Sequence, residues 1–206
     1  MKLYSFAGSC ALATHIVMAW IGKPYEVQMI QKDDLAGPAM RKLNPLGKVP
    51  ILDTGDGVLY ENDAILHYLA ETSPEARLLG DGTPRGHAEV NRWLAVINSD
   101  VHPTFKPLFG ATAYLEDETA IAKTQDNARQ QLRGYFEVLD KQLEGREWLA
   151  GTRSIADPYL FVVLMWTGFV NVDLSGLANL AAFTKRMRAD AGVQRALKEQ
   201  GLDKGH

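Results

Sequence analysis

Cysteine is almost absent from this chain of 206 residues, in which Cys10 is the only one. A single cysteine excludes an internal disulfide and any metal site built from several cysteines, and it is typical of a reducing compartment. The five histidines, at positions 15, 67, 87, 102 and 206, lack the close spacings that zinc sites show. The sequence therefore predicts no metal.

An excess of charge and a long apolar run are also missing. The formal net charge is -3, and both signs are mixed along the chain, so we expect no nucleic-acid partner. The longest apolar run, Tyr159 to Val170, is too short to span a bilayer, and Leu3 to Phe6 is too short for the apolar region of a signal peptide. These absences predict a cytoplasmic protein with no membrane partner.

The first third of the chain alternates between strand and helix patterns. A Gly- and Asp-rich turn at 53–57 joins the last two strands as a hairpin. The order is βαβ, a helix, ββ and a helix, which predicts a small mixed sheet flanked by helices. The expected strands are 2–5, 25–30, 49–52 and 58–60, and the expected helices are 10–21, 36–43 and 62–70, the last one capped by Asn62 or Asp63.

A Gly- and Pro-rich stretch at 80–86 indicates a domain boundary, and no strand pattern follows it. We therefore predict a first domain at 1–78, a linker at 79–86 and an all-helical domain at 87–206. Ser154 and Asp157 form a variant of the capping box at a helix start, with a structural role. The expected helices of this domain are 87–101, 104–115, 118–143, 155–171, 178–190 and 193–200.

The position of Cys10 points to thiol chemistry. It follows a strand and a small-residue loop, and it opens a helical stretch, so the thiol lies where unpaired backbone N–H groups favour an anion. Helix starts are among the places where the pKa of a cysteine falls. Ser9 fits as the N-cap, with its hydroxyl accepting from a first-turn N–H. The alternative is a small buried apolar residue, and position alone leaves both open.

Two further motifs suggest a bound peptide-like ligand. Pro50 begins a strand, and if its peptide bond is cis, the N–H and C=O of Val49 can pair with an extended ligand; a trans turn proline is the commoner case. Glu61 and Asn62 stand at a helix entry, where a carboxylate can bind and an acidic side chain can pair with an amine. Plain helix capping is the alternative for this second motif.

Together these motifs resemble the cytosolic glutathione transferase family, from Met1 to about Leu202, and most closely its bacterial beta class. The motifs of the family are Asn44-Pro45 through Val49-Pro50-Ile51, Glu61-Asn62-Asp63-Ala64-Ile65 through Tyr68-Leu69, and Ser154-Ile155-Ala156-Asp157. Those of the beta class are Met1-Lys2-Leu3 with Gly8, Cys10, Leu12-Ala13 and His15, and Val101-His102 followed by Pro107-Leu108-Phe109.

The resemblance implies a thioredoxin-like α/β domain with a mixed four-stranded sheet, followed by an all-α domain, in a homodimer. It also implies glutathione as the co-substrate. Val49, next to a cis Pro50, would hold its cysteinyl backbone, Glu61 and Asn62 its γ-glutamyl end, and Lys32 its glycine carboxylate. In this chain Asn62 stands where the family has a serine.

For the chemistry, the resemblance places Cys10 near the glutathione sulfur and brings His102 from the helical domain. Ser5 stands where the beta class often has tyrosine, and Ala11 where a serine is common, so the donor that stabilises the thiolate is Ser9, Cys10 itself or a first-turn N–H. The predicted function is a detoxifying transferase that conjugates glutathione to small, mostly apolar electrophiles. One alternative is a monothiol oxidoreductase acting through a mixed disulfide of Cys10 and glutathione. Another is a non-catalytic interaction protein of the same fold.

Overall fold

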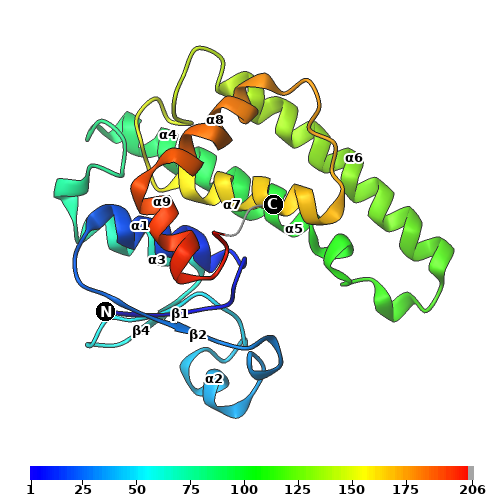
Figure 1. The fold of residues 1–206 in the computed structure, drawn as a ribbon, viewed down its shortest axis with the longest axis horizontal. Helices are drawn as coiled ribbons and strands as arrows, with labels where there is room; N and C mark the ends of the chain where they lie inside the picture. Colours follow the sequence, from blue (N-terminus) through cyan, green and yellow to red (C-terminus); the bar gives the residue numbers. More distant parts are fainter. Residues whose placement is uncertain (204–206) are drawn as a thin grey trace.

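The computed structural model describes residues 1–203 (Figure 1). The last three residues of the predicted helical domain, 204–206, lie outside the described residues. The chain begins with alternating strands and helices, in the predicted order. These elements are β1 (Lys2–Ser5), α1 (Ala11–Ile21), β2 (Glu26–Met29), η1 (Lys32–Asp34), α2 (Pro38–Leu43), β3 (Ile51–Asp53), β4 (Val58–Tyr60), α3 (Asn62–Glu71) and η2 (Pro74–Ala76).

The four strands form one mixed sheet in the order β2-β1-β3-β4. β1 pairs parallel with β2, and β3 pairs antiparallel with both β1 and β4. The parallel pair needs a crossover, which α1 provides, whereas β3 and β4 are joined by a tight hairpin. The predicted fold class is confirmed: a thioredoxin-like α/β domain precedes a helical one.

Helices cover both faces of the sheet, with α1 and α3 on one side and α2 on the other (Figure 1). Leu3 and Leu52 are cross-strand partners, and both are buried in the larger core with α1 and α3. Ile51, the neighbour of Leu52, belongs instead to a smaller core with Ile30 and Met40 of α2. Successive strand side chains point to opposite faces, so adjacent apolar residues fill both layers.

The remainder of the described chain is helical. No helix in this part of the molecule is long and apolar enough to cross a membrane. The elements are α4 (Pro84–Ala95), a π-helical turn η3 (Val96–Val101), α5 (His102–Thr104), η4 (Lys106–Phe109), η5 (Ala113–Leu115), α6 (Glu118–Gln142), α7 (Ala156–Val170), α8 (Ala178–Ala189) and α9 (Ala191–Glu199).

The single helix predicted at 104–115 is wrong. This stretch is broken into the end of α5 and the short turns η4 and η5. Pro107 has no N–H to donate, and Gly110 ends η4 with a φ of 89°, so a regular helix cannot pass through both positions. α4 begins at Pro84, within the stretch predicted as a linker, and the domain boundaries themselves stay a prediction.

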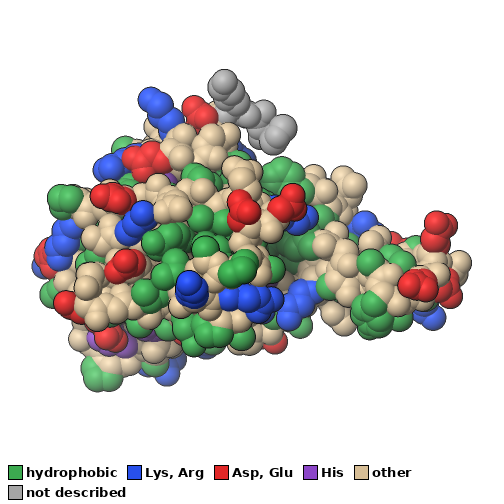
Figure 2. Space-filling model, turned by 90° about the horizontal axis from the view of Figure 1, so that it is seen from below, with side chains coloured by type: hydrophobic (Ala, Val, Ile, Leu, Met, Phe, Trp, Pro, Cys, Tyr) green, Lys and Arg blue, Asp and Glu red, His purple; other side chains and the backbone are tan. Residues whose placement is uncertain are grey.

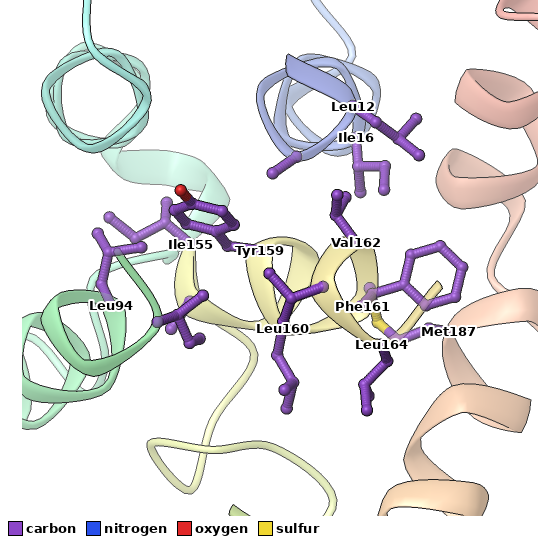
Figure 3. Close-up of a cluster of buried hydrophobic side chains, with 14 of the residues drawn as sticks. Leu12, Ile16, Leu94, Ile155, Tyr159, Leu160, Phe161, Val162, Leu164 and Met187 are labelled. Atoms are coloured by element: carbon purple, nitrogen blue, oxygen red, sulfur yellow. The ribbon is translucent and has the colours of Figure 1, made fainter. Parts of the chain in front are cut away.

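The core continues from the sheet domain into the helical domain through α1. Figure 3 shows Leu12 and Ile16 of α1 pointing toward Val162 of α7. All three side chains are buried, and they belong to one cluster that includes residues of both domains. Because α1 also starts at Cys10, this packing fixes the thiol relative to the helical domain.

Ser154 and Asp157 pair at the start of α7 as predicted, but the N-cap residue is Ile155 and not Ser154, because the Ser154 hydroxyl donates to the Asp157 carboxylate. Asp157 is fully buried, and its carboxylate accepts from the Ser154 N–H at 2.7 Å, the Ser154 hydroxyl at 3.0 Å and the Leu149 N–H at 3.0 Å. Burial raises the pKa of Asp157 to about 6, although the three hydrogen bonds act to lower it. The geometry fits the structural role predicted for these residues.

Candidate active site

Cys10 lies at the junction of the β1–α1 loop and α1. It is the N-cap residue of α1, with helical φ and ψ of -58° and -20°. The thiol is half-buried, and Sγ donates toward the Val49 carbonyl at 3.7 Å, across 39 residues of sequence. The structure thus brings together Cys10 and the Val49-Pro50 motif, which the sequence could relate only through the family resemblance.

Ser9 does not cap α1 through its side chain. Its hydroxyl donates to the Phe6 carbonyl at 2.7 Å, while its backbone carbonyl accepts from the Leu12 N–H at 3.0 Å. The predicted cap is therefore wrong, because the tight turn after β1 uses the hydroxyl first. Ser9 holds the loop that presents Cys10.

The surroundings of the Cys10 sulfur bear on the two alternatives that the sequence left open, a reactive thiolate and a small buried residue. Burial, with a smaller contribution from Glu61, raises the pKa of the Cys10 thiol to about 12, although Lys48 and the backbone N–H groups of Cys10 and Ala11 act to lower it. Loss of water therefore outweighs the helix start. Cys10 is a neutral thiol that donates a hydrogen bond.

The Val49–Pro50 peptide bond is cis. Pro50 is buried, and β3 starts at the next residue, so this turn leads directly into the sheet. Asn44 supports the preceding loop: its side-chain amide donates to the Lys48 carbonyl at 2.8 Å, and its oxygen accepts from the Leu46 N–H at 3.0 Å.

Glu61 is the N-cap residue of α3, which corrects the predicted caps Asn62 and Asp63. Its φ of 74° lies in the left-handed region, where a residue with a side chain is strained by about 1–3 kcal/mol. The side chain is exposed and makes no capping hydrogen bond. Strain of this kind concentrates at ligand sites, and here it presents a free carboxylate beside the helix start.

Asn62 follows as the first residue of α3 and is only 4% exposed. Its Oδ1 accepts from the Thr14 hydroxyl at 2.8 Å, which ties α3 to α1. Its buried Nδ2 has no hydrogen-bond partner within residues 1–203. Asn62 therefore carries a donor that a bound molecule can use.

Lys32 lies in η1 and is exposed. Within the described residues its side chain makes no hydrogen bond or ion pair with the other candidate residues. The structure thus leaves its predicted role untested. The same part of the chain holds no group of three or more His, Cys, Asp or Glu side chains placed to bind a metal ion.

His102 begins α5, and its Nδ1 lies 2.6 Å from the Tyr159 hydroxyl of α7. That hydroxyl also donates to Oδ1 of Asn98, in η3, at 3.2 Å. Burial lowers the pKa of His102 to about 4, with further lowering from the cations Lys106 and Lys48. His102 is therefore a neutral imidazole at physiological pH.

Lys48 connects the two halves of the site electrostatically. The residue precedes Val49, and its charge lowers the pKa of both Cys10 and His102. A cation that acts on both the thiol and the imidazole favours an anionic sulfur nearby. Sequence reasoning missed Lys48, Asn98 and Tyr159 as site residues. The one signal available was the hydroxyl of Tyr159 at the start of an otherwise apolar run.

Aromatic rings surround His102 on the helical-domain side. Trp166 meets His102 edge to face with ring centroids 4.8 Å apart, and Phe105 and Phe109 each lie within 5.4 Å of Trp166. Phe105 is fully buried, whereas Phe109 is 52% exposed, so this group has one open side. On the face seen from below, hydrophobic side chains gather with several Lys and Arg side chains beside them (Figure 2).

Trp166 also joins the two domains at the site. Its indole N–H donates to the Gly8 carbonyl at 2.7 Å, in the loop that carries Cys10. Gly8 adopts a φ of 73°, which suits a residue without a side chain at this turn. The aromatic group and the thiol loop are thereby held together.

Comparison with known proteins agrees with this architecture. A model described as "Glutathione S-transferase, N-terminal domain" matches residues 7–72, and one described as "Glutathione S-transferase, C-terminal domain" matches residues 105–190. The glutathione S-transferase GST-4.5 of Xanthomonas campestris pv. campestris is 49% identical over 204 residues, which cover 98% of this chain and 100% of the relative.

Solved structures give the same result. A glutathione S-transferase from Xylella fastidiosa has a TM-score of 0.95 and 48% identity, with 98% of each chain covered. A sphingomonad glutathione S-transferase complexed with glutathione has a TM-score of 0.86 and 31% identity, covering 98% of this chain and all of that one. A bacterial beta class enzyme of Sphingomonas chungbukensis has a TM-score of 0.86 and 34% identity with the same coverage. The chain therefore belongs to the glutathione S-transferase family, as an enzyme most like the bacterial beta class.

Proposed function

We propose that this enzyme conjugates the thiol of glutathione to small, mostly apolar electrophiles, with the glutathione sulfur and not Cys10 as the nucleophile. The observation that carries the proposal is the hydrogen bond from the Cys10 Sγ to the Val49 carbonyl. A thiol that keeps its proton can donate to a neighbouring thiolate, but it is itself a poor nucleophile.

Glutathione would lie along the turn before β3. The backbone of Val49 would pair with its cysteinyl part, and the free Nδ2 of Asn62 would donate to its γ-glutamyl carboxylate. The exposed Glu61 carboxylate would pair with the ammonium group at the same end, and Lys32 with the glycine carboxylate. The relative solved with glutathione supports this ligand class.

His102 would take up the proton of the glutathione thiol on Nε2. The sulfur then forms the new carbon–sulfur bond, and the leaving group departs with its electron pair, while the imidazolium returns its proton to solvent. The charge of Lys48 favours the thiolate form during this step. Phe105, Phe109 and Trp166 would hold the electrophile against the sulfur, so proximity supplies much of the rate enhancement.

The test compares wild type with Cys10→Ala and Cys10→Ser. Conjugation is measured with a dinitrophenyl halide, disulfide exchange with a glutathione-containing mixed disulfide, and glutathione affinity by calorimetry. Loss of one hydrogen-bond donor should lower kcat/KM for conjugation about tenfold in Cys10→Ala and less in Cys10→Ser. Complete loss of conjugation in both variants, with glutathione affinity unchanged, would contradict the proposal. Such a result, together with disulfide exchange by wild type, would favour the monothiol route.

The proposal extends to a cytoplasmic homodimer with a role in detoxification, as the family resemblance implies. Light scattering coupled to gel filtration measures the mass in solution. A mass of one chain at working concentrations would remove the homodimer from the proposal and leave the chemistry in place.

A further inference from the structure

A short hydrogen-bonded chain leads away from the imidazole of His102. The Tyr159 hydroxyl lies between Nδ1 of His102 at 2.6 Å and Oδ1 of Asn98 at 3.2 Å. Tyr159 is 1% exposed, and burial raises its pKa above the ordinary value of 10, so the hydroxyl keeps its proton. This one proton can go to His102 or to Asn98, but not to both.

The direction of that proton decides which nitrogen of His102 is protonated. If the hydroxyl donates to Asn98, its oxygen accepts from an N–H at Nδ1, and Nε2 of His102 keeps its lone pair. If the hydroxyl donates to His102, the ring proton moves to Nε2, which then cannot take a proton from a thiol. The two arrangements have opposite consequences for proton transfer.

The geometry favours donation to Asn98. Oδ1 of Asn98 is an amide oxygen that can only accept, so its contact with the Tyr159 oxygen at 3.2 Å is a hydrogen bond only if the hydroxyl donates to it. Nδ1 of His102 can either donate or accept at 2.6 Å. Both contacts are therefore satisfied together only when Tyr159 donates to Asn98 and accepts from an N–H at Nδ1.

The fold places these groups with a π-helical turn. Asn98 lies in η3, and His102, four residues later, is the first residue after η3. The wider π-helical turn keeps both side chains on the face toward α7. Nε2 of His102 makes no hydrogen bond within residues 1–203. The atom is not fully buried, so solvent reaches it.

We propose that Asn98 and Tyr159 are positioning residues that hold His102 in its Nδ1–H form, so that the lone pair of Nε2 faces the glutathione thiol. The link to catalysis rests on the proposed function, whereas the tautomer itself does not. No atom is transferred along the chain: the thiol proton goes to Nε2, and the Nδ1 proton stays on the ring.

The experiment is nitrogen NMR on protein labelled at histidine, at neutral pH and without glutathione. Wild type should show His102 protonated at Nδ1 and unprotonated at Nε2. In Asn98→Leu the Tyr159 proton has His102 as its only acceptor, so the ring should change to the Nε2–H form. Asn98→Asp keeps an acceptor oxygen and should keep the wild-type tautomer. Ser99→Ala, the neighbour on the same turn whose hydroxyl donates to the Ala95 carbonyl, is the matched control.

Conjugation kinetics give the second readout. Asn98→Leu should lower kcat roughly tenfold or more, with little change in KM for glutathione, because proton transfer and not binding is impaired. Asn98→Asp and Ser99→Ala should stay near wild type.

An Nε2–H tautomer in wild type, or an unchanged tautomer in a folded Asn98→Leu protein, would overturn the inference. The wild-type spectrum decides the question even if Asn98→Leu does not fold. If the tautomers behave as expected but no protein conjugates glutathione, the positioning stands and the proposed function fails.

Discussion

At the scale of single residues, the protonation state of His102 follows from where the imidazole lies. It is packed against the rings of Trp166 and Tyr159, and two cations, Lys106 and Lys48, act on it. Burial and like charge both disfavour the imidazolium form. His102 thus enters the reaction neutral, able to receive a proton.

The same pKa predicts a dependence of stability on pH. The folded pKa of about 4 lies below the ordinary 6.5, so between these values the unfolded chain binds the extra proton. Stability should therefore fall as the pH drops from 6.5 to 4, by about 3 kcal/mol from this residue. Urea unfolding of wild type and His102→Gln at several pH values measures it.

The variant should lose less stability on the acid side than wild type does. Asp157 acts in the opposite direction, since its raised pKa makes the fold bind a proton below about pH 6, but it is common to both proteins and cancels. Parallel pH curves for the two proteins would show that His102 is not held neutral by the fold.

Cys10 shows how far the sequence reaches at this scale. The strand, loop and helix pattern placed the thiol correctly at the start of α1, and the motifs named Val49 and Glu61. The pKa could not be predicted, because it depends on how deeply folding buries Sγ and on residues far along the chain, Lys48 and Glu61 among them. The local sequence indicates the helix start, which lowers the pKa of the thiol, but it does not indicate the burial, which raises the pKa by more.

At the scale of elements, the carboxylates at two helix starts serve different groups: Asp157 accepts from Leu149 and Ser154, which precede α7, whereas Asp117 accepts from N–H groups of α6 itself. The carboxylate of Asp157 is buried and accepts three hydrogen bonds at the start of α7, whereas Asp117 caps α6 at the surface by accepting from Thr119 and Ala120. Burial makes an unsatisfied N–H more costly than exposure does.

Asp157→Ala should therefore lower the free energy of unfolding by about 3 kcal/mol, and Asp117→Ala by about 1 kcal/mol. Urea denaturation at neutral pH compares the two variants with wild type. Equal losses would mean that the buried network around Asp157 adds nothing beyond an ordinary cap.

The elements themselves were predicted unevenly. Strongly patterned segments such as α1, α6 and α7 lie where the sequence put them, since one apolar face or a fully apolar helix is visible without context. The stretch 104–115 was predicted as one helix from its helical pattern alone. In the structure Phe105 and Phe109 instead stack in the aromatic group beside Trp166, over short turns.

At the scale of the whole molecule, α1 is shared between the domains. It packs on the sheet and on α7 and α9 in one continuous core. Polar contacts repeat the connection: the Gln200 amide donates to the Ser5 hydroxyl at 3.1 Å, and Nε2 of His15 lies 2.7 Å from the Glu199 carboxylate. The two domains therefore depend on each other for stability.

One unfolding transition should follow from this sharing. Three of the four tryptophans, Trp93, Trp148 and Trp166, lie in the helical domain, and the fourth, Trp20 of α1, packs against Trp148, so fluorescence is weighted toward the helical domain and its joint with α1. Far-UV circular dichroism reports on all helices, including α1 and α3. Urea curves from fluorescence and circular dichroism should superimpose. Two separated midpoints would show that the sheet domain opens independently of the helical one.

The domain order and the sheet follow from sequence patterns, but the joint between domains does not. The bond from Trp166 to Gly8 spans 158 residues, and neither residue carries a local signal for the other. The same holds for Asn98, Tyr159 and His102, which meet only after α4 and α7 pack. Contacts between distant segments complete the site, which is why part of it was missed.

The central claim is that glutathione, and not Cys10, supplies the reacting sulfur. Its most direct test is the intact mass of the protein after incubation with oxidised glutathione at neutral pH. A half-buried thiol that keeps its proton should leave the mass unchanged, while a sample unfolded in urea gains one glutathione and serves as the positive control. A glutathione adduct on the folded protein would show a reactive Cys10 thiolate and contradict the account.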